Sequence, residues 1–75
     1  MQFSSNLKQF RLNFNYTQKE MATLLGITER GYRNYEIGTR EPNITTLIYI
    51  ADLFGVTLDD LVGRTLPEKP LMDSK

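Results

Sequence analysis

Apolar residues recur at helical spacing in five segments of the chain, and each segment ends at a residue that favours helix termination. A glycine closes four of the segments, because glycine adopts the left-handed conformation of a helix end at little cost. Asn15, which can replace glycine at such positions, closes the first segment. No stretch alternates between apolar and polar residues as a strand does. The pattern predicts an all-α fold with helices at about 5–14, 18–25, 29–37, 44–54 and 58–62.

Capping residues mark the starts of these helices. Thr17 and Glu20 have the spacing of a capping box, in which each side chain accepts a hydrogen bond from the other residue's backbone N–H. Thr57 and Asp60 repeat this arrangement before the last helix. Apolar residues lie just before each threonine cap and four residues after it, where they can pack together across the helix start. Single caps are predicted before the helices at 29–37 and 44–54, from Thr28 and Asn43.

A chain of 75 residues is long enough for one small domain. Because it contains neither Cys nor His, disulfides and the usual zinc sites cannot stabilise it, and the packing of the helices must do so. We expect one domain over 1–63, followed by a proline-containing tail over 64–75. The predicted core consists of Leu7, Phe10, Met21, Ala22, Leu25, Ile27, Tyr32, Tyr35, Leu47, Ile50, Ala51, Phe54, Val56 and Leu61.

Other apolar residues are harder to place in a single core. Exposed apolar residues that cluster indicate an interface. We therefore expect a homodimer, with contacts at Tyr49, Leu53, Leu58 and Leu66. The residues that are hard to bury are Phe3, Leu12, Phe14, Ile48, Tyr49 and Leu53.

The missing residue types also limit the chemistry. Without Cys or His, the chain has no thiol or imidazole nucleophile and few ligands for transition metals. Asp59 and Asp60 are a candidate carboxylate pair, but acidic residues in a first helical turn usually complement the helix dipole. We therefore expect no catalytic residue, no metal site, no cofactor and no enzymatic activity.

Targeting signals are also missing from the sequence. The first ten residues lack the basic start and apolar stretch of a signal peptide. The longest apolar run, Leu47–Ala51, is too short to cross a bilayer. We expect a cytoplasmic protein that does not bind membranes, and no site for a small-molecule effector is evident.

The helix expected at 29–37 has one polar and one aromatic side. At about 100° per residue, Tyr32 and Tyr35 lie opposite a polar face. Such a face is most often simply solvated. Here the preceding helix and the short turn at Gly26 predict a helix-turn-helix, which changes that interpretation. The polar side consists of Glu29, Arg30, Arg33 and Asn34, residue types that hydrogen-bond base edges in the major groove.

The run from Thr17 to Asn43 resembles the Cro/phage-repressor-type helix-turn-helix (Xre) family. It opens its second helix with Thr-Gln and carries Tyr-Glu-x-Gly-x-Arg-x-Pro from Tyr35 onward. The resemblance covers about residues 5–63. It implies a compact five-helix, lambda-repressor-like DNA-binding domain with its helix-turn-helix at the second and third helices. The implied function is that of a sequence-specific transcriptional regulator of double-stranded DNA, with repression as the expected effect.

The resemblance also implies roles for single residues. Arg11 and Glu36 match a pair that ties the first helix to the third, although Arg11 is also a candidate for phosphate contact. The third helix would read bases through Thr28, Glu29, Arg30, Arg33 and Asn34. Phosphates would be held by Thr17, Gln18, Lys19, Thr39, Arg40 and Asn43.

Two residues depart from the family pattern. Gly31 stands inside the reading helix, where the family usually has Ser, Thr or Ala, at a cost of about 0.5–1 kcal/mol relative to Ala. Glu29 is acidic at the leading reading position, which suits a cytosine amino group or an orienting contact to an arginine. The operator sequence therefore cannot be read from the motif.

Partners and charge complete the expectation. A palindromic operator would require a homodimer. The alternative is a protein-interaction module on the same fold, such as an antitoxin or an assembly partner. In such a module, changing Arg30 or Asn34 would not cause a loss of specific DNA binding.

The net charge is zero, with nine basic and nine acidic residues. Residues 1–40 nevertheless carry six basic and three acidic side chains, so the positive half contains the expected DNA surface.

Overall fold

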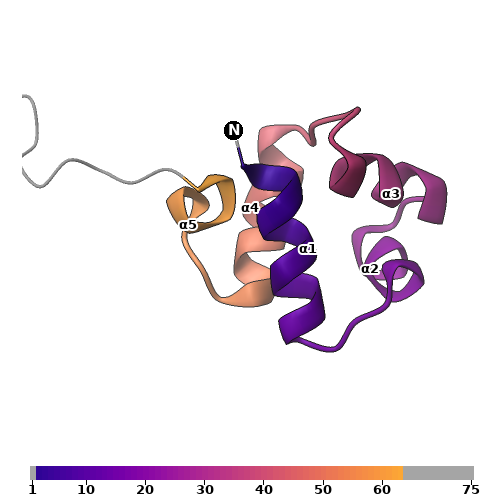
Figure 1. Ribbon diagram of the computed structural model, residues 1–75, viewed down its shortest axis with the longest axis horizontal. Helices are drawn as coiled ribbons and strands as arrows, with labels where there is room; N and C mark the ends of the chain where they lie inside the picture. The colour runs from indigo at the N-terminus through magenta and orange to yellow at the C-terminus, as the bar shows by residue number, and fades with distance from the viewer. Residues whose placement is uncertain (1, 64–75) are drawn as a thin grey trace, which may run out of the picture.

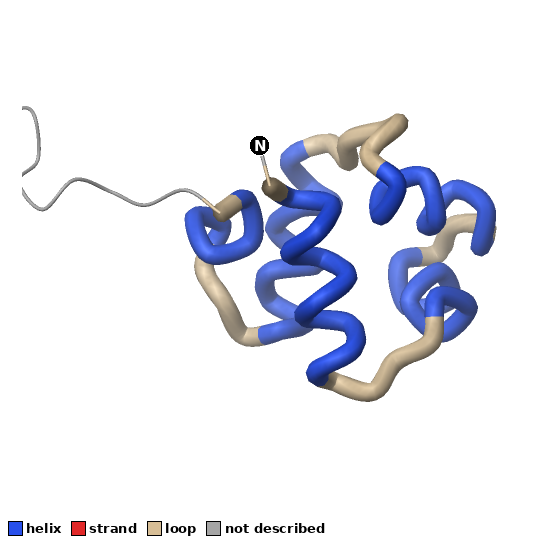
Figure 2. Tube along the Cα trace, in the orientation of Figure 1, coloured by secondary structure: helices blue, strands red, loops and turns tan. Residues whose placement is uncertain are grey.

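A computed structural model describes residues 2–63, which form five helices without any strand (Figures 1 and 2). The predicted all-α fold and the bounds of the last four helices are confirmed. The first helix begins two residues earlier than predicted and ends one residue earlier. The helices are α1 (Phe3–Asn13), α2 (Gln18–Leu25), α3 (Glu29–Ile37), α4 (Ile44–Phe54) and α5 (Leu58–Val62).

The predicted caps are present at the helix starts. In α2, the Thr17 hydroxyl accepts from the Glu20 N–H at 3.0 Å, and the Thr17 N–H donates to the Glu20 carboxylate at 2.8 Å. Thr57 and Asp60 form the same reciprocal pair at the start of α5. Asn15 has a φ of 62° after α1, as its place in the sequence predicted. These local signals explain why four of the five helices have the expected bounds.

Helix α1 contacts α3 on one side and α5 on the other (Figure 1). Helix α2 packs against α3 and α4, and α4 also packs against α5. Phe10 of α1 stacks on Phe54 of α4, with ring centroids 5.5 Å apart. The N4 residues of the three threonine-capped helices, Met21, Tyr32 and Leu61, are fully buried. These N4 residues are the fourth residues of their helices, and each belongs to the buried core. The apolar residues before the caps pack against the same core, so the helix starts also supply its centre.

Eight of the nine buried apolar residues were predicted to be in the core, and Phe3 is the exception. The six other predicted core residues are only partly buried and pack against this cluster: Phe10, Leu25, Ile27, Tyr35, Leu47 and Val56. Phe3 is only 2% exposed, although the sequence suggested that it would be hard to bury. The earlier start of α1 places Phe3 one turn before Leu7, on the same helix face. The Gln2 N–H also donates to the Val62 carbonyl at 3.3 Å, which holds the start of α1 against α5. The buried residues of the apolar core are Phe3, Leu7, Met21, Ala22, Tyr32, Ile50, Ala51, Phe54 and Leu61.

The residues expected at a dimer interface differ in exposure. Tyr49 is 48% exposed, whereas Leu53 and Leu58 are half-buried and pack against the core. Leu53 was expected to be hard to bury. Because α4 packs against both α2 and α5, more than one side of this helix is covered. Leu66 and the predicted tail lie outside the described residues.

Candidate nucleic-acid interface

The turn between α2 and α3 brings these two helices into direct contact. Gly26 ends α2 in the left-handed conformation, with a φ of 70°. The Ile27 N–H then donates to the Ala22 carbonyl at 3.0 Å, which closes the turn. Ala22 is buried, and its small side chain lets the two helices approach closely. This arrangement is a helix-turn-helix unit.

The first two turns of α3 carry most of the predicted base-reading residues. The Thr28 hydroxyl accepts from the Gly31 N–H at 3.0 Å and so caps the helix. Glu29, Arg30 and Arg33 are exposed. Neither arginine forms an ion pair with any residue between 2 and 63. Their guanidinium groups are therefore available to a ligand.

Asn34 joins the predicted base-reading face to the loop that follows α3. Its side chain is half-buried, and its backbone carbonyl accepts from the N–H groups of Gly38 and Thr39 at 3.0 and 3.1 Å. The Thr39 hydroxyl donates to the same carbonyl at 3.4 Å, as does the Arg40 N–H. The loop residues predicted to hold phosphates are thus anchored directly to the end of α3.

A buried ion pair links α1 to α3. Arg11 Nε donates to Glu36 Oε2 at 2.6 Å, and Arg11 Nη2 donates to Glu36 Oε1 at 3.2 Å. Arg11 Nη1 donates to the Tyr16 carbonyl at 2.9 Å. The Arg11 and Glu36 side chains are only 9% and 4% exposed. The link between the first and third helices is therefore confirmed, and the Arg11 guanidinium is occupied within the fold.

Two further side chains donate to the same carboxylate. The Tyr32 hydroxyl donates to Glu36 Oε2, and Gln18 Nε2 donates to Glu36 Oε1 at 3.1 Å. We call the four side chains of Arg11, Gln18, Tyr32 and Glu36 the Glu36 network. Its members come from α1, α2 and α3, so it ties all three helices to one buried charge.

The network determines the protonation of its members. Burial by itself raises the pKa of Glu36, but hydrogen bonds from Arg11, Tyr32 and Gln18 outweigh it and hold that pKa below its ordinary value. Burial, and then the hydrogen bond to Glu36, raises the pKa of Tyr32. The carboxyl is therefore ionised and the phenol protonated near neutral pH, the states that their hydrogen bond requires.

The hydroxyl of Tyr32 is a contribution that the sequence prediction missed, because this residue was assigned to the core alone. A usable signal was present, since Tyr32 and Glu36 are four residues apart and share a helix face. Glu36 also lies close in angle to Glu29, on the polar side of α3. Its burial follows from the packing of α1 against this part of the helix.

The predicted phosphate-binding residues lie at the starts of α2 and α4 and in the loop after α3. Thr17 and Asn43 use their side-chain oxygens as helix caps. Lys19 and Arg40 are exposed and form no ion pair within the described part of the chain. Among the predicted phosphate-binding residues, Lys19 and Arg40 therefore provide the positive charge.

An open depression of about 670 Å³ lies between the end of α1 and the start of α2. Glu29 of α3 also lines it, so it adjoins the predicted base-reading face. Lys8 and Lys19 contribute positive charge to its lining. The sequence prediction did not include Lys8, although it lies on α1 one turn before Arg11.

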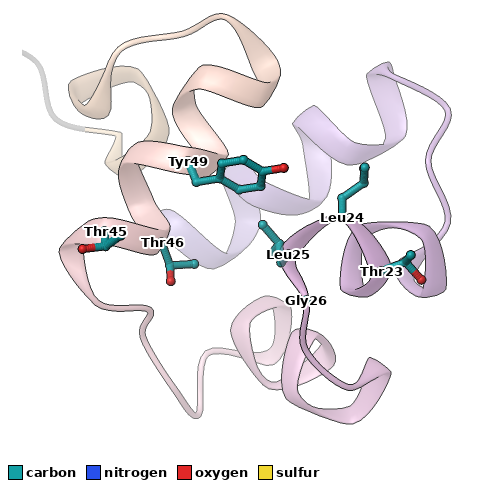
Figure 3. A pocket seen from close by; sticks show the side chains of 7 residues that line it. All are labelled: Thr23, Leu24, Leu25, Gly26, Thr45, Thr46 and Tyr49. Carbon is teal, nitrogen blue, oxygen red and sulfur yellow. The ribbon is translucent and has the colours of Figure 1, made fainter.

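A second depression, of about 400 Å³, lies between α2 and α4. Leu24, Leu25 and Tyr49 surround it together with threonine side chains (Figure 3). Its lining contains no charged side chain. Over residues 2–63, no group of three or more His, Cys, Asp or Glu side chains is placed to hold a metal ion. Within the same range, every helix is too short or too polar to cross a membrane.

Comparisons with known proteins agree with this geometry. The helix-turn-helix family model matches residues 7–61. The chain is 45% identical over 71 residues to YqaE, an uncharacterized HTH-type transcriptional regulator of Bacillus subtilis strain 168, covering 95% of this chain and 61% of YqaE. It is 36% identical over 64 residues to the cryptic phage CTXphi transcriptional repressor RstR of Vibrio cholerae, covering 85% of this chain and 57% of RstR.

The fold is also similar to that of a solved protein. A crystal structure of a transcriptional regulator from Listeria innocua superposes with a TM-score of 0.83 at 27% identity, covering 97% of this chain and 68% of that protein. The chain spans about three fifths of the length of YqaE and RstR. The family model and these relatives show that the chain belongs to the helix-turn-helix family of DNA-binding transcriptional regulators.

Proposed function

We propose that this protein represses transcription by binding a specific operator with α3 in the major groove of double-stranded DNA. The main support for this proposal is the outer face of α3. Arg30 and Arg33 are exposed and form no ion pair within residues 2–63, on a helix that is capped at its start and anchored through Glu36. A firmly held helix with free hydrogen-bonding side chains suits the reading of base edges. The relative RstR is a transcriptional repressor, which supports the direction of regulation.

Each part of the site has a proposed task. Arg30 forks onto a guanine, Asn34 bonds an adenine, and Glu29 accepts from a cytosine amino group or orients an arginine. Lys19 and Arg40 hold phosphates, which position the protein without reading the sequence. The supporting contacts to bases come from Thr28 and Arg33, and those to the backbone come from Thr17, Thr39 and Asn43.

We also propose that the protein binds as a homodimer to a palindromic operator. Exposed apolar side chains on α4 support this, because Ile44, Ile48 and Tyr49 are 59%, 46% and 48% exposed. Two copies of α3 would then lie about 34 Å apart, one turn of DNA. Since bacterial relatives regulate transcription, we place this activity in the cytoplasm.

Selection of bound sites from random duplex DNA, at one fixed salt concentration, tests the operator proposal. We expect enrichment of a single palindrome whose half-sites are about one helical turn apart. Enrichment of no sequence would contradict base reading and favour the interaction module. Enrichment of an isolated half-site would contradict the dimer.

Sedimentation tests the dimer separately. Tyr49→Glu places a charge on the exposed apolar face of α4, so we expect a shift from dimer toward monomer. Gln9→Glu, at an exposed position of α1, is the control. An unchanged sedimentation coefficient for Tyr49→Glu would place the interface elsewhere.

A further inference from the structure

The side chain of Gln18 is engaged inside the protein. It is half-buried, and its amide lies 3.1 Å from Glu36 Oε1. Because an ionised carboxylate only accepts hydrogen bonds, the amide must present its nitrogen to Glu36. We infer that Gln18 is a positioning residue, whose side chain acts on DNA binding through Glu36. This inference rests on the proposed DNA-binding function.

The hydrogen bond spans the two halves of the helix-turn-helix at the end remote from the turn. Near the turn, α2 and α3 are held by apolar contacts such as that of Ala22. Apolar contacts have little directional preference, so they only weakly define the rotation of one helix relative to the other. Gln18 lies in the first turn of α2 and Glu36 in the second half of α3. Their bond therefore fixes the distance between these regions.

This distance matters because DNA contacts both regions at once. Lys19 follows Gln18 directly, so Gln18 also sets the position of a proposed phosphate contact. Arg33, three residues before Glu36, lies on the proposed base-reading face. Displacement of one region by about 1 Å weakens the combination of both sets of contacts. We therefore expect loss of Gln18 to weaken specific binding more than non-specific binding.

The Glu36 carboxyl gives a test that needs no DNA. Gln18→Met keeps a side chain of similar length and removes the donor to Glu36. The carboxyl titration of Glu36, followed by NMR, should then move to a higher pKa than in the wild type, since the hydrogen bond from Gln18 lowers that pKa. Gln9→Met, at an exposed position of α1, is the matched control and should leave the titration unchanged. An unchanged titration in Gln18→Met would overturn the inference.

A double-mutant cycle tests the consequence for DNA. The background Arg11→Met/Glu36→Met replaces the buried ion pair by apolar side chains, a change that proteins often tolerate. In the wild type, Gln18→Met should weaken binding to the selected operator by about tenfold, the effect of losing one hydrogen bond to a charged group. In the background without Glu36, the same substitution should have little further effect.

The outcomes separate the inference from the proposed function. An equal loss in both backgrounds would show that Gln18 contacts DNA directly and would overturn the positioning role. Urea unfolding identifies any variant that does not fold, in which case the NMR titration alone decides. If the wild-type protein bound no DNA sequence specifically, the proposed function would fail, while the titration would still report whether Gln18 acts on Glu36.

Discussion

At the scale of single residues, Glu36 is a buried carboxylate whose charge the fold must compensate. A buried carboxylate without partners is strongly destabilising, because it loses its hydration. Glu36 accepts four hydrogen bonds, two from Arg11 and one each from Tyr32 and Gln18. No buried side-chain nitrogen or oxygen lacks a partner in the described part of the chain. The charge is therefore compensated, and removing one partner should cost more than replacing the whole group by apolar residues.

The lowered pKa of Glu36 predicts a loss of stability in acid. In the unfolded chain this carboxyl titrates near its ordinary pKa of about 4.3, and in the folded protein its pKa is lower. Its contribution to the free energy of unfolding is thus complete above the ordinary pKa, and it is lost as the pH falls from there through the folded pKa. Urea unfolding at a series of pH values should show a steeper acid decline for the wild type than for Glu36→Gln.

Exposed Glu41 provides the control for this measurement, because Glu41→Gln should follow the wild type. Parallel acid declines for the wild type and Glu36→Gln would contradict the prediction. If Glu36→Gln is too unstable to measure, Arg11→Met/Glu36→Met removes the same carboxyl without leaving an unpaired cation.

Arg30 is the residue whose loss should change sequence preference. Arg30→Ala should reduce affinity for the selected operator by about 1–3 kcal/mol and relax preference at one base pair, because a bidentate contact to a base is lost. Binding to sequence variants at a fixed salt concentration measures both effects. Equal base preference in Arg30→Ala and the wild type would remove Arg30 from the reading face.

At the scale of elements, α3 depends on its two ends. It has nine residues, with Gly31 in its interior and four more of lower helix propensity, Tyr32, Asn34, Tyr35 and Ile37. The Thr28 cap fixes its start, and Glu36 anchors its last turns. Four helices have the bounds that their caps predicted, whereas α1 begins at Phe3, after Gln2, whose side chain makes no capping hydrogen bond. The start of α1 depends on its contacts with α5, and a local pattern does not contain these.

The space around Gly31 makes a prediction about this helix. A Cβ at Gly31 would lie 3.1 Å from the Thr28 hydroxyl oxygen, which is shorter than an ordinary van der Waals contact. Gly31→Ala should therefore raise the free energy of unfolding by less than the value expected in a helix interior, which is about 0.5–1 kcal/mol. In a Thr28→Ala protein, which itself loses about 1 kcal/mol with the cap, the same substitution should give its full gain.

Urea unfolding of the four proteins in this cycle measures the difference. The control is Gly31→Ala with Thr28→Ser, which keeps the hydroxyl and therefore the close contact. Strictly additive changes in Gly31→Ala and Thr28→Ala would mean that the contact relaxes freely.

At the scale of the whole molecule, the neutral total charge hides a polarised surface. Six of the nine basic residues lie between 1 and 40, in α1 to α3 and the loop that follows α3. Arg11 is neutralised by Glu36, so the exposed basic side chains of this half are Lys8, Lys19, Arg30, Arg33 and Arg40. We expect weak non-specific binding to DNA and a correspondingly greater dependence on dimerisation and base contacts.

The salt dependence of binding tests this distribution. Arg40→Ala should weaken binding to all sequences alike and reduce the slope of log affinity against log salt by about one, because one phosphate contact is lost. Asp52→Asn is the control, because it changes the net charge at an exposed position of α4. This substitution should leave the slope unaltered. An unchanged slope in Arg40→Ala would place this residue away from the phosphates.

The amino-acid sequence by itself determined the helices, most of the core and the helix-turn-helix, because caps, apolar spacing and turn residues act over fewer than about eight neighbours. It also presented Glu29, Arg30 and Arg33 on one helix face. Only the tertiary structure decided that Phe3 is buried and that Gln18 and Tyr32 meet Glu36. These contacts join residues on different helices or depend on the burial of a polar face, so they arise only when α1 packs onto α3 and α5.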